Sequence, residues 1–169
     1  MSHIEIITET ETAFGHLHSL LSGIDREHFN TKPFPGSWSP AQVGDHLYRS
    51  YAVLETLKGK TAPLNGRNID EKAREFRPVF LDFNTKLESP DFILPSEKPI
   101  EQEHLLSNLQ TRTDAIMEFV RENDLSAICL DFELPGAGPL TRLEWLHFIS
   151  VHTQRHNHQL KNIIKHFPR

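Results

Sequence analysis

The sequence predicts an all-α protein, a four-helix bundle with a long ordered crossover between its second and third helices. Four stretches repeat apolar residues at intervals of three and four, which is the spacing of one helix face. No segment of useful length alternates apolar and polar residues as a half-buried strand does, and the best short candidate, residues 129–134, is discounted. About forty residues (59–99) separate the second helix from the third, and a connection of that length allows these two helices to run parallel.

The first two helices are expected over about residues 8–25 and 40–59. In the first, one apolar stripe is made of Phe14, Leu17, Leu21 and Ile24. The second begins with Ser39 as N-cap and Pro40 at the first helical position, and Gln42 completes a capping box. Its stripe is made of Val43, Leu47, Leu54 and Leu57.

The third and fourth helices are expected over about residues 100–123 and 141–166. The stripe of the third is made of Leu105, Leu109, Ile116 and Val120. The fourth follows a loop rich in proline and glycine, and Thr141 with Glu144 forms a second capping box. Its stripe is made of Trp145, Ile149, Leu160 and Ile163.

The crossover between the second and third helices has an unusual composition. Its five prolines exclude one long helix: Pro63, Pro78, Pro90, Pro95 and Pro99. Its apolar residues are too many for a disordered linker: Phe76, Phe80, Phe83, Phe92, Ile93 and Leu94. We therefore expect an ordered segment that packs on the bundle.

Composition restricts the classes of function. The chain has 169 residues, which suits one domain, and a formal charge of −5, which argues against nucleic-acid binding. Its single cysteine, Cys129, excludes a disulfide framework, a cysteine-rich zinc site and an iron–sulfur cluster. The N-terminal segment does not resemble an export signal, and no apolar run has the length of a membrane span. We expect a cytoplasmic protein without nucleic-acid or membrane partners.

Histidine is over-represented, with eleven residues, and three of them fall on inward stripes. His152 and His156 are four residues apart on the fourth helix and therefore lie on one face. His46 lies on the stripe of the second helix and can supply a third imidazole. Three imidazoles with a fourth position open to solvent are typical of a catalytic zinc site, although imidazole also suits nickel, copper and iron. The alternative is that each is a core histidine hydrogen-bonded to backbone or hydroxyl groups.

A di-iron carboxylate bundle is a competing interpretation, because it uses Glu-x-x-His on each of two helices. Two such strings occur, Glu101 to His104 and Glu144 to His147. Each lies in the first turn of its helix. In antiparallel helices these turns would lie at opposite ends of the bundle, where they cannot share a pair of metal ions.

Four further residues are considered for a role in the site, and two of them are expected to be structural only. Cys129 lies between Ile128 and Leu130 and is expected to be buried and unreactive. Asp45 is either a hydrogen-bonding partner of the metal ligands or a solvated helix residue, and Gln159 could orient a ligand or face solvent. Trp38 is expected to pack against the first turn of the second helix.

Two segments carry a family resemblance. Residues 38–47, Trp-Ser-Pro-Ala-Gln-Val-Gly-Asp-His-Leu, resemble the helix-two signature of the DinB/YfiT-like superfamily. Residues 150–160 resemble the helix-four motif of the same superfamily, His-x-x-x-His followed three residues later by Gln. That motif often carries Glu after the first histidine and Arg-Gly before the glutamine, whereas this chain has Thr153 and Asn157-His158 there.

The resemblance implies one DinB-like domain over residues 1–169, folded as an up-down-down-up bundle with the crossover as an insertion. It also implies that His46, His152 and His156 bind one divalent ion, most often zinc or nickel. Members of the superfamily are described as metal-dependent hydrolases and as thiol S-transferases.

The sequence thus favours a metal-dependent enzyme that acts on a small molecule and uses an open coordination position. A low-molecular-weight thiol would be the co-substrate of a transferase. The general base stays unassigned, with His158, Asp45 and metal-bound hydroxide itself as the candidates. The alternative is a non-catalytic binding module whose fourth ligand comes from Asp45, Glu55 or Glu88. A homodimer is possible, and the sequence does not decide the oligomeric state.

Overall fold

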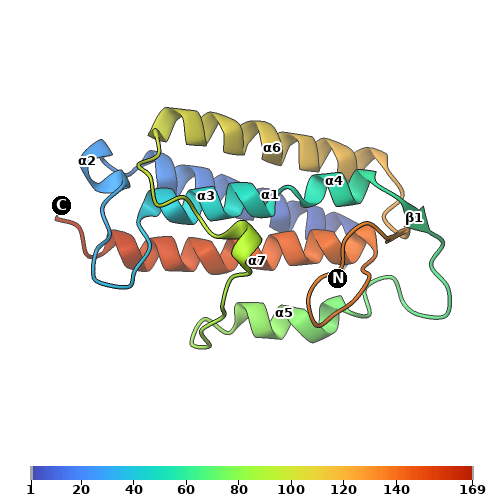
Figure 1. Cartoon of the computed structure of the whole chain (residues 1–169). Coiled ribbons are helices and arrows are strands. Elements are labelled where there is room, and N and C mark those ends of the chain that lie inside the picture. Colours follow the sequence, from blue (N-terminus) through green and yellow to red (C-terminus); the bar gives the residue numbers. More distant parts are fainter. Residues whose placement is uncertain (1, 169) are drawn as a thin grey trace.

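The computed structural model describes residues 2–168, and its four long helical segments form a bundle (Figure 1). These segments are α1 (His3–Ser22), α3 (Pro40–Ser50) followed by α4 (Val53–Lys58), α6 (Gln102–Glu122) and α7 (Arg142–Ile164). A short helix, α2 (Arg26–Phe29), lies between α1 and α3. The crossover contains β1 (Thr61–Ala62), α5 (Ala73–Leu81) and the 3₁₀ turn η1 (Asp91–Ile93), and β2 (Ile128–Cys129) precedes α7. The all-α four-helix bundle is confirmed.

The helices run up, down, down and up along the bundle (Figure 1). α1 and α7 are parallel: Ser150 donates to the carboxylate of Glu9, and one turn or more further along, Asn157 donates to the carbonyl of Ala13. α6 begins where α1 ends, since the amide of Gln102 donates to the carbonyl of Leu21 at 3.0 Å. The long crossover allows α3 and α6 to run parallel.

Capping boxes set the beginnings of three long helices. Ser39 with Gln42 caps α3 and Thr141 with Glu144 caps α7, as the sequence predicts. A third box, Ser2 with Glu5, starts α1 at His3. The expected start near residue 8 was therefore wrong, because the apolar stripe was used to place it and the cap lies upstream of that stripe.

The second bundle helix is interrupted, where the sequence predicts one continuous helix. The backbone N–H of Ala52 donates to the carbonyl of Arg49, and that of Leu54 donates to the carbonyl of Tyr51. These i to i+3 hydrogen bonds tighten the chain locally and separate α3 from α4. The buried Tyr51 hydroxyl donates to Thr153 at 2.7 Å, which fixes the interruption against α7.

The crossover is ordered and packs on the bundle through α5. Phe80 of α5 contacts Phe148 of α7 edge to face, with ring centroids 5.2 Å apart. Arg77 of α5 binds the Glu9 carboxylate of α1 through two hydrogen bonds of 3.0 Å. The predicted role of the crossover in covering the bundle is confirmed.

A two-residue strand, β2, overlaps the discounted candidate at residues 129–134 only in Cys129, and the rest of that candidate forms no strand. β2 pairs antiparallel with β1, with Cys129 opposite Thr61. Two residues are too short to show alternation in the sequence, and the partner strand lies in the distant crossover. Cys129 itself is buried, and burial raises the pKa of its thiol to about 11, as expected of an unreactive residue.

Gly44 allows α3 to approach α1 and α6 closely. A Cβ atom at this position would lie 2.9 Å from a methyl carbon of Leu105 and 3.1 Å from one of Leu21. A larger residue here would force the Leu105 and Leu21 side chains, or α3 itself, to shift.

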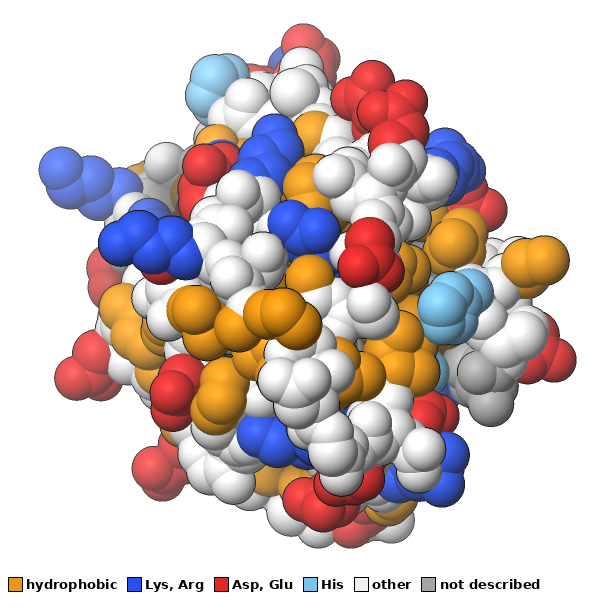
Figure 2. Space-filling view, turned by 90° about the vertical axis from the view of Figure 1, so that its right-hand side faces the viewer, with side chains coloured by type: hydrophobic (Ala, Val, Ile, Leu, Met, Phe, Trp, Pro, Cys, Tyr) orange, Lys and Arg blue, Asp and Glu red, His pale blue; other side chains and the backbone are white. Residues whose placement is uncertain are grey.

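The surface carries mixed charge, and none of the described helices could span a lipid bilayer. Figure 2 shows one end of the bundle, where acidic and basic side chains are interspersed with apolar ones.

Candidate metal centre

The three predicted ligands meet between α3 and α7. His46 comes from α3, whereas His152 and His156 lie one turn apart on α7. Nε2 of His152 lies 3.1 Å from Nε2 of His46 and 3.1 Å from Nε2 of His156. The candidate ligand atoms of the three residues all lie within 4.8 Å of one another. This spacing allows one cation to contact all three imidazoles.

Two of the three rings are oriented by acceptors at their outer nitrogen atoms. Nδ1 of His46 donates to the carbonyl of Ile93 at 2.9 Å, and Nδ1 of His156 donates to Oε1 of Gln159 at 2.7 Å. In a neutral imidazole only one nitrogen carries a hydrogen. The Nε2 atoms of His46 and His156 therefore present lone pairs to the centre of the cluster.

The converging lone pairs show whether the cluster is better satisfied by hydrogen bonds among the histidines or by a bound metal ion. His152 has one Nε2–H at most, so it can donate to His46 or to His156 and not to both. The core-histidine alternative therefore leaves a buried acceptor without a partner, which costs about 1–3 kcal/mol. A divalent cation would accept all three lone pairs, and outer-nitrogen partners of this kind commonly orient metal-binding histidines.

Burial keeps the imidazoles neutral. His46, His152 and His156 are 1%, 6% and 8% exposed. Burial lowers the pKa of each ring, and the charge of a neighbouring histidine adds to the effect for His152 and His156. The pKa of His156 falls to about 3. Neutral imidazole is the form that binds metal ions.

Aromatic rings surround the cluster. The indole of Trp38 lies 5.0 Å from the His46 ring and 6.2 Å from the His156 ring, measured between centroids. Phe148 stacks on His152 at 5.2 Å with an interplanar angle of 15°. The sequence analysis assigned Trp38 to the first turn of the second helix and missed its contact with the histidines. These rings hold the imidazoles in place and limit the access of water.

The cluster opens into a pocket of about 530 Å³ that all three histidines line. The opposite walls come from α5, from the segment around η1 and from the loop between β2 and α7. The volume suits a small organic molecule. A ligand in this pocket would face the side of the cluster that α3 and α7 do not cover.

None of the three residues considered as a fourth ligand belongs to the histidine cluster. One Asp45 oxygen accepts hydrogen bonds from Nε of Arg49 and from the backbone N–H of Ser96, both at 2.8 Å. Glu88 lines the pocket from the crossover, and Glu55 is exposed outside the pocket. Within residues 2–168, the cluster consists of the three histidines and includes no carboxylate.

The two Glu-x-x-His strings have structural roles. Glu101 caps α6 by accepting hydrogen bonds from the backbone of Glu103 and His104. Glu144 caps α7 and binds Arg67 through two hydrogen bonds. The first turns of α6 and α7 lie at opposite ends of the bundle, as the di-iron argument required (Figure 1).

The departures from the helix-four motif also have structural explanations. Thr153 accepts the hydrogen bond of Tyr51 between α7 and α3, and Asn157 binds the backbone of α1. His158 stacks on Phe83 with centroids 4.4 Å apart and accepts a hydrogen bond from Asn162. His158 does not line the pocket of the cluster, which removes its support as the general base.

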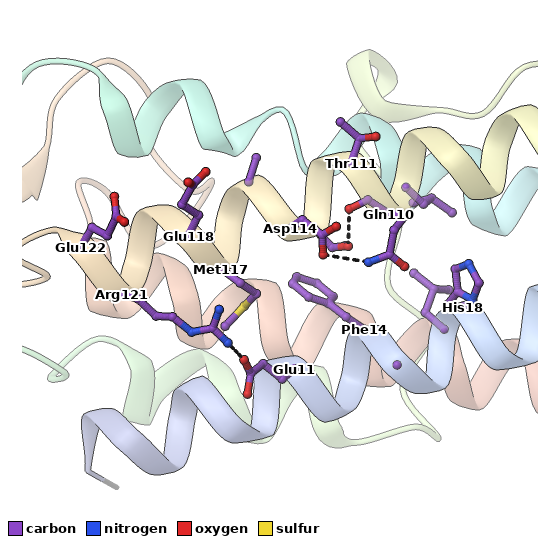
Figure 3. Close-up of a pocket in the computed structure, with 15 residues that line it drawn as sticks. Glu11, Phe14, His18, Gln110, Thr111, Asp114, Met117, Glu118, Arg121 and Glu122 are labelled. Carbon is purple, nitrogen blue, oxygen red and sulfur yellow. Dashed lines mark hydrogen bonds and ion pairs between the residues drawn. The ribbon is translucent and has the colours of Figure 1, made fainter.

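A larger depression of about 920 Å³ lies between α1 and α6 (Figure 3). Two polar pairs lie along it: Arg121 forms an ion pair with Glu11 across the groove, and the Gln110 amide donates to Asp114 along α6. Phe14 and Met117 form its apolar floor. None of its lining residues belongs to the histidine cluster.

The fold and the site define a class: an up-down-down-up helical bundle in which two facing helices hold a buried group of three histidines compatible with a metal ion. The chain belongs to the DinB superfamily, whose sequence profile matches residues 9–160. It is 30% identical over 154 residues to the uncharacterized protein YuaE of Bacillus subtilis (strain 168). The aligned region covers 85% of this chain and 87% of YuaE. No solved structure matches the chain significantly.

Proposed function

We propose that the protein is an enzyme that binds one divalent ion, zinc or nickel, through His46, His152 and His156. The observation that carries this proposal is the convergence of the lone pairs of His46 and His156 on one buried point, enforced by Ile93 and Gln159. Membership of the DinB superfamily supports it. A bound divalent ion supplies Lewis-acid chemistry, which lowers the pKa of a coordinated water or thiol.

The pocket favours transfer of a small thiol over hydrolysis. Hydrolysis at a metal centre commonly uses a nearby general base. Among the lining residues the carboxylate is Glu88, which is exposed to solvent and therefore poorly suited to that role. A thiol would need less help, because a metal ion held by the three histidines would lower the thiol pKa enough for its proton to pass to water. Arg49 also lines the pocket, and Asp45 fixes its Nε at 2.8 Å. The terminal guanidinium N–H groups can then bind a carboxylate of the thiol or of its acceptor.

Cobalt substitution tests the open position directly. The protein would be purified without a histidine tag, stripped with a chelator and loaded with Co²⁺. Addition of N-acetylcysteine should then produce a sulfur-to-cobalt charge-transfer absorption, and the zinc or nickel form should accelerate conjugation of that thiol to a chromogenic aryl halide. The His46→Ala variant is the matched control and should show neither effect. A cobalt spectrum that no added thiol or anion changes would contradict the open position and favour the non-catalytic module.

A further inference from the structure

Aromatic side chains form a continuous row from the pocket mouth to the histidine cluster. Phe92 of η1 contacts Phe132 of the loop between β2 and α7, with centroids 5.7 Å apart. Phe132 stacks on Trp145 at 5.8 Å, and Trp145 contacts Phe148 at 5.6 Å. Phe148 in turn stacks on His152. All these residues line the same pocket, so one of its walls is aromatic from the surface inward.

The outer members of the row are not core residues. Phe92 is 62% exposed and Phe132 is 37% exposed, whereas Trp145 is 1% exposed. Val79, which is 48% exposed, extends the apolar surface on the α5 side of the pocket. An exposed apolar surface that continues into a pocket is typical of a ligand site, because folding alone does not require it.

Phe92 and Phe132 come from segments that are distant in the chain and meet only at this mouth. Phe92 lies beside Ile93, whose carbonyl orients His46. Phe132 lies in a loop where Gly136 and Gly138 have φ values of +83° and +69°. The mouth is thus built from the two connections that flank the site, and the helices of the bundle supply the inner wall.

We propose that Phe92 and Phe132 select the substrate, and that the site takes molecules with an aromatic body attached to the group that reacts at the cluster. This inference rests on the proposed metal site. The aromatic body would lie along the row, because edge-to-face and offset-stacked contacts with successive rings favour a planar apolar partner. An aliphatic substrate would gain burial but not these contacts.

A series of hydroxamates tests the proposed metal site and the proposed aromatic selection separately. All of them carry the same metal-binding group, and they differ in the group attached to it. Dissociation constants of the zinc-loaded protein would be measured by calorimetry for acetohydroxamate, benzohydroxamate and cyclohexanecarbohydroxamate. We expect benzohydroxamate to bind at least about tenfold more tightly than acetohydroxamate, since its phenyl ring would be buried against the aromatic wall. Cyclohexanecarbohydroxamate, of similar size, should bind less tightly than benzohydroxamate.

Substitutions at the mouth then test the assignment. Phe92→Ala and Phe132→Ala should each reduce the preference for benzohydroxamate by about threefold or more and leave the binding of acetohydroxamate unchanged. Phe34→Ala is the matched control, because Phe34 is 48% exposed but does not line the pocket. Phe92 and Phe132 are both partly exposed, so we expect both variants to fold, which circular dichroism would check.

The outcomes are distinguishable. Equal binding of acetohydroxamate and benzohydroxamate, or a preference that survives both mouth substitutions, would overturn the aromatic selection and leave the metal site standing. Failure of acetohydroxamate to bind the zinc-loaded protein would contradict the open coordination position, and the aromatic selection would fall with it.

Discussion

The imidazole of His46 donates a hydrogen bond of 2.9 Å from Nδ1 to the carbonyl oxygen of Ile93, across 47 residues of chain. His46 belongs to the bundle, whereas Ile93 belongs to the crossover. The segment that covers the bundle therefore also orients one candidate metal ligand. Because Phe92 is the preceding residue, the same turn connects the candidate metal ligand to the mouth of the pocket.

Substitution of His46 should separate the site from the fold. His46→Ala removes one of the three candidate nitrogen ligands, so zinc affinity should fall on the order of 100-fold or more, given that loss of an outer partner alone costs about 10–100-fold. Competition with a chromogenic chelator measures this affinity. Far-ultraviolet circular dichroism should stay helical, because the apolar stripes of four helices supply the core.

The control for this variant is His16→Ala, since His16 is an exposed histidine on α1. It should retain the zinc affinity of the wild type. Stability is compared between metal-free His46→Ala and the metal-free wild type, because a bound ion would itself stabilise the folded state. Metal-free His46→Ala should melt within a few degrees of the metal-free wild type, and a collapse of helical content would contradict the separation of site and fold.

Gln159 should tune metal affinity without being a ligand. Its Oε1 accepts the hydrogen bond of His156 Nδ1 at 2.7 Å, which directs the Nε2 lone pair inward. Gln159→Ala should weaken zinc binding about 10–100-fold and leave one ion per chain at saturation. Gln110→Ala on the surface of α6 is the matched control and should bind zinc normally. Equal affinity of the two variants would show that Gln159 does not orient the ring.

His147 should make stability depend on pH independently of the metal site. Its Nδ1 accepts a hydrogen bond from Arg77 at 3.1 Å, and its Nε2 is buried without a partner among the described residues. Burial, and then the charge of Arg77, lowers the pKa of His147 to about 4. As the pH falls from about 6.5 to about 4, His147 becomes protonated in the unfolded chain but stays neutral in the folded chain. The free energy of unfolding should therefore fall by about 3 kcal/mol through this residue.

Urea unfolding of the metal-free protein at pH 7 and pH 4.5 measures this effect. His147→Asn keeps an acceptor near the position of Nδ1 and cannot be protonated, so its stability should depend less on pH than that of the wild type. His104→Asn, at an exposed histidine of α6, should behave as the wild type does. Parallel pH profiles for the wild type and His147→Asn would show that His147 does not carry the effect.

Local patterns predicted the helices and paired His152 with His156, because caps and the four-residue spacing act over one or two turns. The capping boxes at Ser39 and Thr141 are of this kind, as is the pair His152 and His156. His46 was added because it lies on the inward stripe of its own helix. The box at Ser2 was equally visible in the sequence and was missed only because the apolar stripe begins later.

The features that the sequence did not predict depend on contacts between distant segments. The carbonyl of Ile93 carries no residue-specific signal, and only the fold brings it to His46. The interruption at Tyr51 is fixed by a hydroxyl contact with Thr153, 102 residues away. The exposure of Phe92 and its contact with Phe132 likewise arise from the path of two connections, which has no periodicity to detect.

Elemental analysis of protein purified without a histidine tag and without chelator tests the central claim most directly. The proposed site at His46, His152 and His156 predicts about one divalent ion per chain, zinc or nickel, in the wild type and much less in His46→Ala. Purified wild-type protein that neither contains nor takes up a stoichiometric divalent ion, or that contains two irons per chain, would contradict the three-histidine site.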